Sequence, residues 1–208
     1  VCGDTVWSGI LQDGRFMAVL SDGMGHGESA ALFSRETAEL LRLCLDAGYT
    51  SQQALTAVNG MMLLSGHGER FTTADLIIID LWSGRASLDK LGAAGTWLCQ
   101  EDKLTYLTGD ALPIGILEHI ESRTASLRLH SGDALVLITD GVEEAFSGKA
   151  ALETQLKEVL NVYDPQAAAE ALVQSAIEAD GGRPRDDQTV MVIRLENAEG
   201  VQSGEDDV

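Results

Sequence analysis

The sequence has 208 residues, of which 33 are acidic and 14 are basic, giving a formal net charge of -19 at pH 7. A chain of this length corresponds to one compact domain, or to one domain with a small appendage. It lacks the surplus of positive charge that binding to nucleic acid or to an anionic membrane requires, so an anionic partner would need a cation as intermediary. The 45% hydrophobic content excludes a disordered chain, and no apolar run approaches the roughly 18 residues that span a bilayer.

The three cysteines are too few and too scattered for a disulfide framework or a thiolate metal site, which is typical of a reducing, cytoplasmic compartment. The chain begins at Val1 without a secretory signal, so we expect an excised part of a longer protein. Residues 196–208 contain five acidic residues and no basic one. This composition predicts a disordered tail after a domain at 1–195.

The N-terminal part predicts a hairpin followed by two helices. Two apolar runs flank the Asp-Gly pair at 13–14, which is a strong hairpin signal. A glycine-rich run at 22–27 then leads into apolar residues at helical spacing, which end near Gly48. Ser51 is expected to cap a second helix, which the glycines at 66–68 terminate.

The rest of the chain predicts mainly strands, with two more helices near its end. The continuous apolar run at 73–82 predicts a strand that is buried on both faces. Helices are expected at about 150–160 and at 165–179, where proline suits the first helical position. The other strands are expected at 85–90, 96–100, 103–107, 123–129, 134–139 and 189–195. Antiparallel strands with helices grouped into two blocks predict an α+β layered sandwich rather than a wound βαβ sheet.

Aspartates recur where predicted strands give way to turns, at Asp4, Asp22, Asp140 and the pair at 186–187. Around Asp22 and Asp140 an apolar strand ends in a hydroxyl residue, then Asp, then Gly, whose backbone can turn sharply. Carboxylate and carbonyl oxygens gathered in this way are the hard ligands that Mg²⁺ or Mn²⁺ prefers. The sequence has no cluster of Cys or His residues that would favour zinc instead.

These segments also allow two other interpretations. An isolated Asp next to Gly is more often simply a turn, and we interpret the pairs at 13–14 and 132–133 in that way. The glycine-rich run at 22–27 also resembles a nucleotide-binding loop. Glu28 stands where the last glycine of G-x-G-x-x-G is required, however, and the lysine of a phosphate-binding loop is absent, which disfavours nucleotide binding.

Several short motifs follow one another in an order that is more specific than any one of them. The segment at 21–27 reads SDGMGHG and is followed by Ala30-Ala31. The other motifs are Cys2-Gly3-Asp4, Thr72-Thr73-Ala74-Asp75, Gly92-Ala93-Ala94-Gly95, Leu112-Pro113-Ile114-Gly115, Thr139-Asp140-Gly141 and Asp186-Asp187-Gln188-Thr189. The set resembles the metal-dependent protein serine/threonine phosphatases (the PPM, or type 2C, family), in the branch of stage II sporulation protein E and related bacterial stress-response regulators.

The resemblance implies an α-β-β-α sandwich of two antiparallel sheets flanked by helices, with a site for two Mn²⁺ or Mg²⁺ ions. Asp22 would bridge both ions, and Asp140 and Asp186 would complete the first, so these three are the expected catalytic residues. The implied metal-binding residues are Asp4, Asp22, Gly23, Asp140, Asp186 and, as the alternative to Asp186, Asp187. Two divalent ions about 3.5–4 Å apart lower the pKa of a shared water, so that hydroxide can attack phosphorus in line with the leaving serine oxygen.

By resemblance, the substrate would be a protein phosphorylated on serine or threonine, specifically an anti-sigma-factor antagonist in a bacterial partner-switching pathway. The alternative is a catalytically weak regulatory module that keeps the fold and binds a partner. We expect no contact of this domain with nucleic acid or membrane. The resemblance allows a membrane-attached region upstream in the full-length protein.

Some positions depart from the family pattern or stay open. Cys2 stands where this branch usually has serine and is expected to be a buried small residue rather than a nucleophile. For His26, shaping the loop is favoured over donating a proton to the leaving group. Arg183 and Arg185 either help to hold phosphate or belong to a solvated loop. The apolar run at 61–64 either forms part of a regulatory face or packs in the core.

Overall fold

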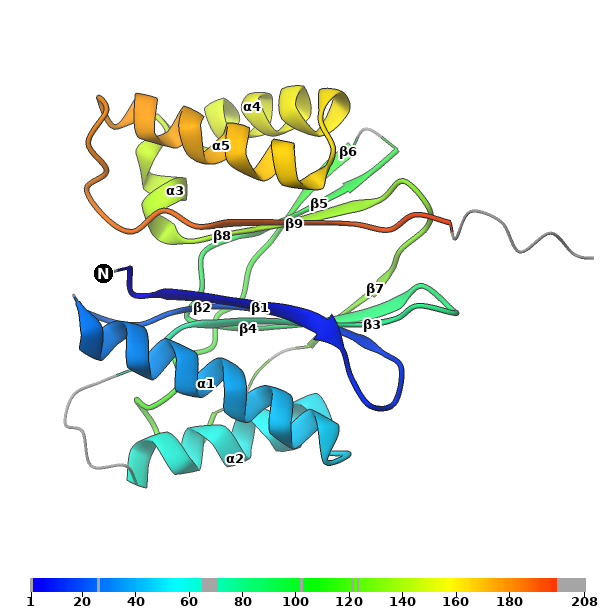
Figure 1. Ribbon diagram of the computed structural model, residues 1–208, viewed down its shortest axis with the longest axis vertical. Coiled ribbons are helices and arrows are strands. Elements are labelled where there is room, and N and C mark those ends of the chain that lie inside the picture. Colours follow the sequence, from blue (N-terminus) through cyan, green and yellow to red (C-terminus); the bar gives the residue numbers. More distant parts are fainter. Residues whose placement is uncertain are drawn as a thin grey trace, which may run out of the picture.

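The computed structural model describes residues 2–25, 27–64, 71–101, 103–120, 122 and 124–197. Two antiparallel sheets are stacked face to face, and helices cover the outer face of each sheet (Figure 1). This arrangement confirms the predicted sandwich. Residues 198–208, which make up most of the predicted tail, lie outside the described residues, so the domain boundary stays a prediction.

The first sheet has five strands in the order β1-β2-β3-β4-β7. Its strands are β1 (Asp4–Ile10), β2 (Phe16–Asp22), β3 (Ala74–Asp80), β4 (Arg85–Leu91) and β7 (Thr124–Arg128). The predicted hairpin joins β1 to β2, and the Asp13 side chain accepts hydrogen bonds from the backbone and the guanidinium of Arg15 in the turn. The central strand β3 is buried along nearly its whole length, because helices cover one face of the sheet and the second sheet covers the other.

The second sheet has four strands in the order β6-β5-β8-β9. Its strands are β6 (Lys103–Leu107), β5 (Thr96–Gln100), β8 (Ala134–Ile138) and β9 (Val190–Arg194). All four were predicted, with boundaries that differ by at most one residue. The interior between the two sheets is mainly apolar and includes Leu20 of β2, Ile77 of β3 and Leu137 of β8.

Two helices cover the first sheet and three cover the second (Figure 1). The helices are α1 (Glu28–Asp46), α2 (Ser51–Leu64), α3 (Asp140–Ala145), α4 (Lys149–Val162) and α5 (Pro165–Ala179). The predicted cap of α2 is wrong by one residue. The Thr50 hydroxyl accepts from the Gln53 backbone N–H at 3.3 Å, and the Gln53 side chain accepts from the Thr50 N–H at 2.9 Å. This reciprocal pair needs a polar residue three positions after the cap, which Ser51 does not have.

The short helix α3 was not predicted, because six residues are too few to show helical periodicity. The expected turn at Asp140 is therefore corrected: Asp140 is the first residue of α3, and Val142 is fully buried beneath the helix. The expected position of Asp4 is also corrected, since it begins a strand rather than following one. Asp22, by contrast, ends β2 as expected.

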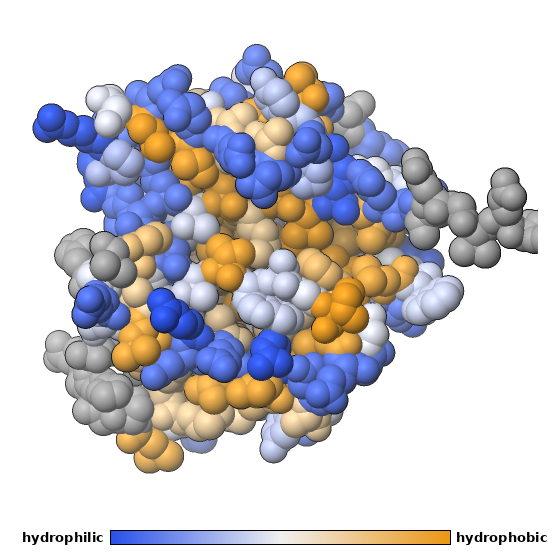
Figure 2. Space-filling model, in the orientation of Figure 1, coloured by the Kyte–Doolittle hydropathy of each residue, from blue (hydrophilic) through white to orange (hydrophobic). Residues whose placement is uncertain are grey.

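The apolar run at 61–64 packs only partly in the core, and a regulatory role for its exposed part stays a prediction. Met62 is buried in the core beneath the first sheet, whereas Leu64 is 88% exposed and Met61 is 40% exposed. Apolar surface also runs along the edge of the sandwich seen in Figure 2, where the edge strand β1 exposes Val6 and Ile10. Within the described residues, no helix combines the length and the apolar character needed to cross a membrane.

Candidate metal centre

The predicted carboxylates gather at one end of the sandwich because of how the strands pair. Asp4 and Asp22 lie directly opposite each other in the antiparallel pair β1–β2. Asp140 follows β8, and the pair at 186–187 precedes β9, the neighbour of β8. This is the end of the sandwich at which Figure 1 marks the N-terminus. Asp22, at the end of β2, and Asp140, at the start of α3, also line one small cavity between them.

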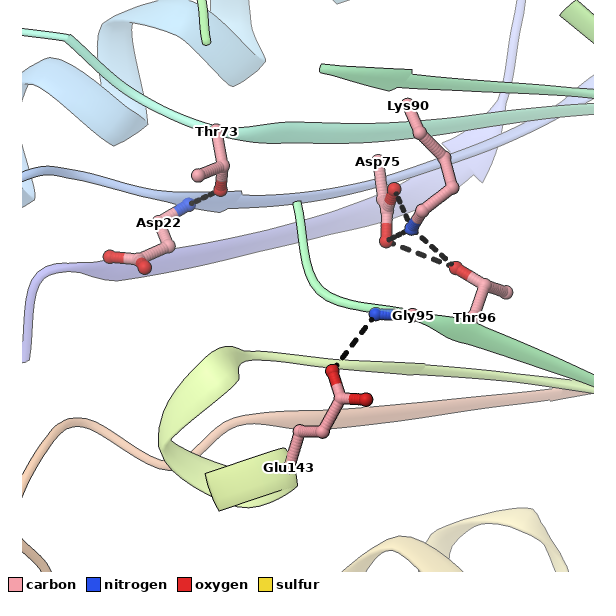
Figure 3. A network of polar contacts seen from close by, with 7 residues as sticks. All are labelled: Asp22, Thr73, Asp75, Lys90, Gly95, Thr96 and Glu143. Atoms are coloured by element: carbon pink, nitrogen blue, oxygen red, sulfur yellow. Dashed lines mark hydrogen bonds and ion pairs between the residues drawn. The ribbon is translucent and has the colours of Figure 1, made fainter. Parts of the chain in front are cut away.

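Two threonines before β3 hold the backbone of Asp22. The Thr73 N–H donates to the Asp22 carbonyl at 2.8 Å, and the Asp22 N–H donates to the Thr73 hydroxyl at 3.1 Å (Figure 3). The Thr72 hydroxyl donates to the same carbonyl at 2.7 Å. Neither threonine was predicted as a site residue, although the Thr-Thr motif that contains them was noted in the sequence.

Glycines next to the aspartates allow segments to approach closely. A Cβ atom at Gly141 would lie 2.2 Å from the Asp187 carbonyl oxygen and 3.3 Å from the Asp186 Cβ. A Cβ atom at Gly23 would similarly lie 2.2 Å from the Ala30 carbonyl oxygen. The glycines at 23 and 141 are therefore required by tertiary packing.

Gly141→Ala is expected to push the segment at 186–187 away from Asp140 and to weaken Mn²⁺ binding by about tenfold, the lower end of what changes around a metal site cost. Isothermal titration calorimetry measures the affinity. Gly60→Ala is the matched control, because Gly60 lies inside α2 and a Cβ there would meet nothing within 4 Å. The control should bind Mn²⁺ normally and be stabilised by about 0.5–1 kcal/mol. Equal affinities in both variants would contradict this prediction.

The carboxylates form a strongly anionic cluster. Burial, together with the negative charges of Asp4, Asp140 and Asp186, raises the pKa of Asp22 to about 7. Burial also raises the pKa values of Asp4 and Asp140. Within the described part of the chain, no ion pair joins these residues to a lysine or arginine.

The donor atoms fit a hard divalent cation. Both carboxylate oxygens of Asp4 are buried without a hydrogen-bond partner of normal geometry among the described residues, although the nearby Thr189 hydroxyl partly opposes the rise in the Asp4 pKa. A buried, unpaired carboxylate is costly unless a cation or donor compensates it. The oxygens of Asp4, Asp22 and Asp140 are the ligand type that Mn²⁺ and Mg²⁺ prefer.

The two neighbouring aspartates at 186–187 face different parts of the cluster. The charge of Asp186 acts on both Asp22 and Asp140. Asp187 accepts from the Gly3 N–H at 2.5 Å and lies close to Asp4 and Cys2. The two side chains are therefore not equivalent, and the assignment of Asp186 as ligand, with Asp187 as the alternative, stays a prediction.

The sequence also left open the roles of Cys2, Arg185 and His26. Cys2 is exposed, so the prediction of a buried residue is wrong; it precedes β1 at the open end of the sandwich, where Gly3 rather than Cys2 packs inward. Arg185 is 73% exposed and pairs with Asp180 at 2.6 Å, which favours a solvated loop over phosphate binding. His26 lies outside the described residues, so neither of its suggested roles is tested.

The fold is that of PP2C-type protein phosphatase domains. The PP2C phosphatase domain of SpoIIE from Bacillus subtilis, solved with a fragment of its regulatory domain, matches with a TM-score of 0.84 and 29% identity, over 96% of this chain and 59% of that chain. The RsbU and RsbW domains of Rv1364c from Mycobacterium tuberculosis match with a TM-score of 0.81 and 23% identity, over 94% of this chain and 56% of that one. The latter likeness shows the fold alone.

The chain belongs to the stage II sporulation protein E (SpoIIE) family, whose model matches residues 12–196. Stage II sporulation protein E of Priestia megaterium is 31% identical over 200 residues, which are 95% of this chain and 34% of the relative. The Bacillus subtilis (strain 168) protein is 30% identical over 203 residues, which are 95% of this chain and 24% of the relative. The chain thus spans about a third or less of the length of these relatives.

Proposed function

We propose that this chain is a metal-dependent phosphatase domain that hydrolyses phosphoserine or phosphothreonine on a protein substrate. The observation that carries the proposal is the cluster of carboxylates around Asp22, in a chain of the SpoIIE family. The pKa of about 7 at Asp22 reflects burial and neighbouring negative charge, which a divalent cation would relieve. The family is metal-dependent, and Mn²⁺ or Mg²⁺, two ions per site, are our proposed cofactors.

In this proposal Asp22 would contribute to both ion sites and Asp140 and Asp186 to the first. The Gly23 carbonyl, together with Asp4 through water, would serve the second. Bound divalent ions would supply Lewis-acid polarisation of the phosphoryl oxygens and a lowered pKa of water. The protein's own contribution is to orient these ligands. Hydrogen bonds from residues 72 and 73 hold the Asp22 backbone, and the missing side chain at Gly141 lets the 186–187 segment approach.

We further propose that the substrate is a phosphorylated anti-sigma-factor antagonist, as the family resemblance implies. A net charge of -19 would repel a phosphoprotein, so the phosphate would reach the site only after cations had reversed the local field. This requirement ties substrate binding to metal binding. The alternative to this proposal is that the chain is a catalytically weak module that binds a partner.

The proposal is tested by measuring phosphate release from p-nitrophenyl phosphate and from a phosphoserine protein. We expect release with MnCl₂, none with EDTA, and recovery when Mn²⁺ is added in excess over EDTA. Asp22→Asn prepared in the same way should release far less phosphate, which would exclude a contaminating phosphatase as the source of the activity. No release at any Mn²⁺ or Mg²⁺ concentration would favour the partner-binding module.

A further inference from the structure

A buried charge cluster lies between the two sheets and contains none of the predicted metal ligands. Asp75 of β3 and Lys90 of β4 are register partners, and the Lys90 ammonium donates to both Asp75 carboxylate oxygens at 2.5 and 2.6 Å. Lys90 also donates to the Thr96 hydroxyl of β5 at 3.0 Å, and that hydroxyl donates to Asp75 at 3.0 Å (Figure 3). The three residues, called here the inter-sheet cluster, close a triangle of hydrogen bonds and are at most 3% exposed.

The inter-sheet cluster is an unusual element in this interface. Asp75 and Lys90 belong to the first sheet, whereas Thr96 belongs to the second. The surrounding contacts between the sheets are mainly apolar, and apolar contacts are not directional. A buried ion pair is seldom needed for stability, since apolar replacements of similar volume often serve as well. A directional link between otherwise apolar layers therefore calls for another explanation.

On the first sheet, the cluster lies next to the residues that hold Asp22. Asp75 is opposite Leu20, two residues before Asp22, in the register of β2 and β3. Asp75 also follows Thr73 by two residues, and Thr73 makes two hydrogen bonds with the Asp22 backbone. A two-residue stretch of backbone thus connects Asp75 to the contacts that hold Asp22.

On the second sheet, hydrogen bonds connect the strand that carries Thr96 to the helix that carries Asp140. The residue before Thr96 is Gly95, whose N–H donates to the Glu143 carboxylate of α3 at 3.3 Å (Figure 3). The Tyr106 hydroxyl donates to the other oxygen of Glu143 at 2.5 Å. Asp140 begins the same short helix.

We propose that the inter-sheet cluster is a positioning device for the metal centre: it sets the spacing between Asp22 on one sheet and Asp140 beside the other. Metal affinity depends on ligand spacing, because a cation binds well only when its ligands are held at the required separations. The inference rests on the proposed function, since it concerns Mn²⁺ affinity at that same site. None of the three residues of the cluster is a proposed ligand.

Thr96→Val is the most direct test, because it keeps the shape of the side chain and the Asp75–Lys90 pair while cutting the link to the second sheet. We expect its dissociation constant for Mn²⁺, measured by calorimetry, to rise by about tenfold. Thr96→Ser restores the hydroxyl and should bring the constant back to within about twofold of the wild type. Thr37→Val is the matched control, since Thr37 is equally buried but its hydroxyl has no hydrogen-bond partner among the described residues.

A second variant covers the case in which Thr96→Val does not fold, as judged by circular dichroism. The double substitution Asp75→Leu with Lys90→Met removes both charges together and is expected to fold. It should also bind Mn²⁺ about tenfold more weakly. A folded Thr96→Val or double variant with wild-type Mn²⁺ affinity would overturn the positioning role while leaving the proposed function intact. Failure of the wild-type protein to bind Mn²⁺ would overturn both.

Discussion

Asp22→Asn is expected to lower Mn²⁺-dependent phosphate release by about a hundredfold or more, equivalent to about 3 kcal/mol of transition-state stabilisation. The amide keeps the shape of the side chain but removes the negative charge at the centre of the carboxylate cluster. Asp140→Asn should have a similar effect, since Asp140, at the start of α3, lines the same cavity. Initial rates at several Mn²⁺ concentrations separate weaker metal binding from a slower chemical step.

The matched control for this prediction is Asp13→Asn. Asp13 also precedes a glycine, but it lies in the exposed β1–β2 turn and pairs with Arg15 rather than with the cluster. Its substitution should leave the rate unchanged. If Asp22→Asn kept the wild-type rate at all Mn²⁺ concentrations, the assignment of Asp22 to the metal centre would be wrong.

The metal-free protein is expected to lose stability as the pH rises from about 4 to about 7. Burial and neighbouring carboxylates raise the folded-state pKa of Asp22 to about 7, well above its ordinary value of 3.8. The folded state therefore binds more protons than the unfolded state between these values, and its free energy of unfolding falls with increasing pH. Allowing for solvent screening at this partly exposed group, we expect a loss of roughly 1–2 kcal/mol from Asp22.

Urea unfolding in EDTA at pH 5 and pH 7.5 measures this effect. Asp22→Asn has no carboxyl group to titrate at this position, so its free energy of unfolding should depend less on pH. Mn²⁺ should stabilise the wild type most at the higher pH, because it binds the ionised carboxylates and only the folded state offers the complete site. Identical pH dependence in the wild type and the variant would show that ionisation of Asp22 is not the source of the loss of stability.

The sequence predicted most elements where the local signal was strong. Helix α5 begins at Pro165 and ends at Ala179 as predicted, because proline and the spacing of apolar residues mark it independently of the rest of the fold. Helix α3 was missed, since it is held by the burial of Val142 rather than by a periodic pattern. The cap of α2 was misplaced because several polar residues compete at that position.

The site was predicted as a set of residues but not as an arrangement. Asp22 and Asp140 were singled out because each follows a predicted strand and precedes a glycine, and the family motifs supplied the order of the whole set. Their supports were not found: Thr73 acts through hydrogen bonds to Asp22, and Lys90 looks like an ordinary strand residue in the sequence. Such partners become visible only when strands that are distant in the sequence are brought together.

By itself, the sequence determined the layered α+β class, the family resemblance and the aspartates that could bind metal, because these depend on local pattern and residue chemistry. Only the tertiary structure decided that Asp4 faces Asp22, and that the inter-sheet cluster joins the two sheets. Strand register and sheet stacking set these contacts, and neither is encoded in any single segment. Among the many acidic residues, Asp75 is buried and compensated by Lys90, whereas the carboxylates around Asp22 have no lysine or arginine partner in the part of the chain that the structure describes.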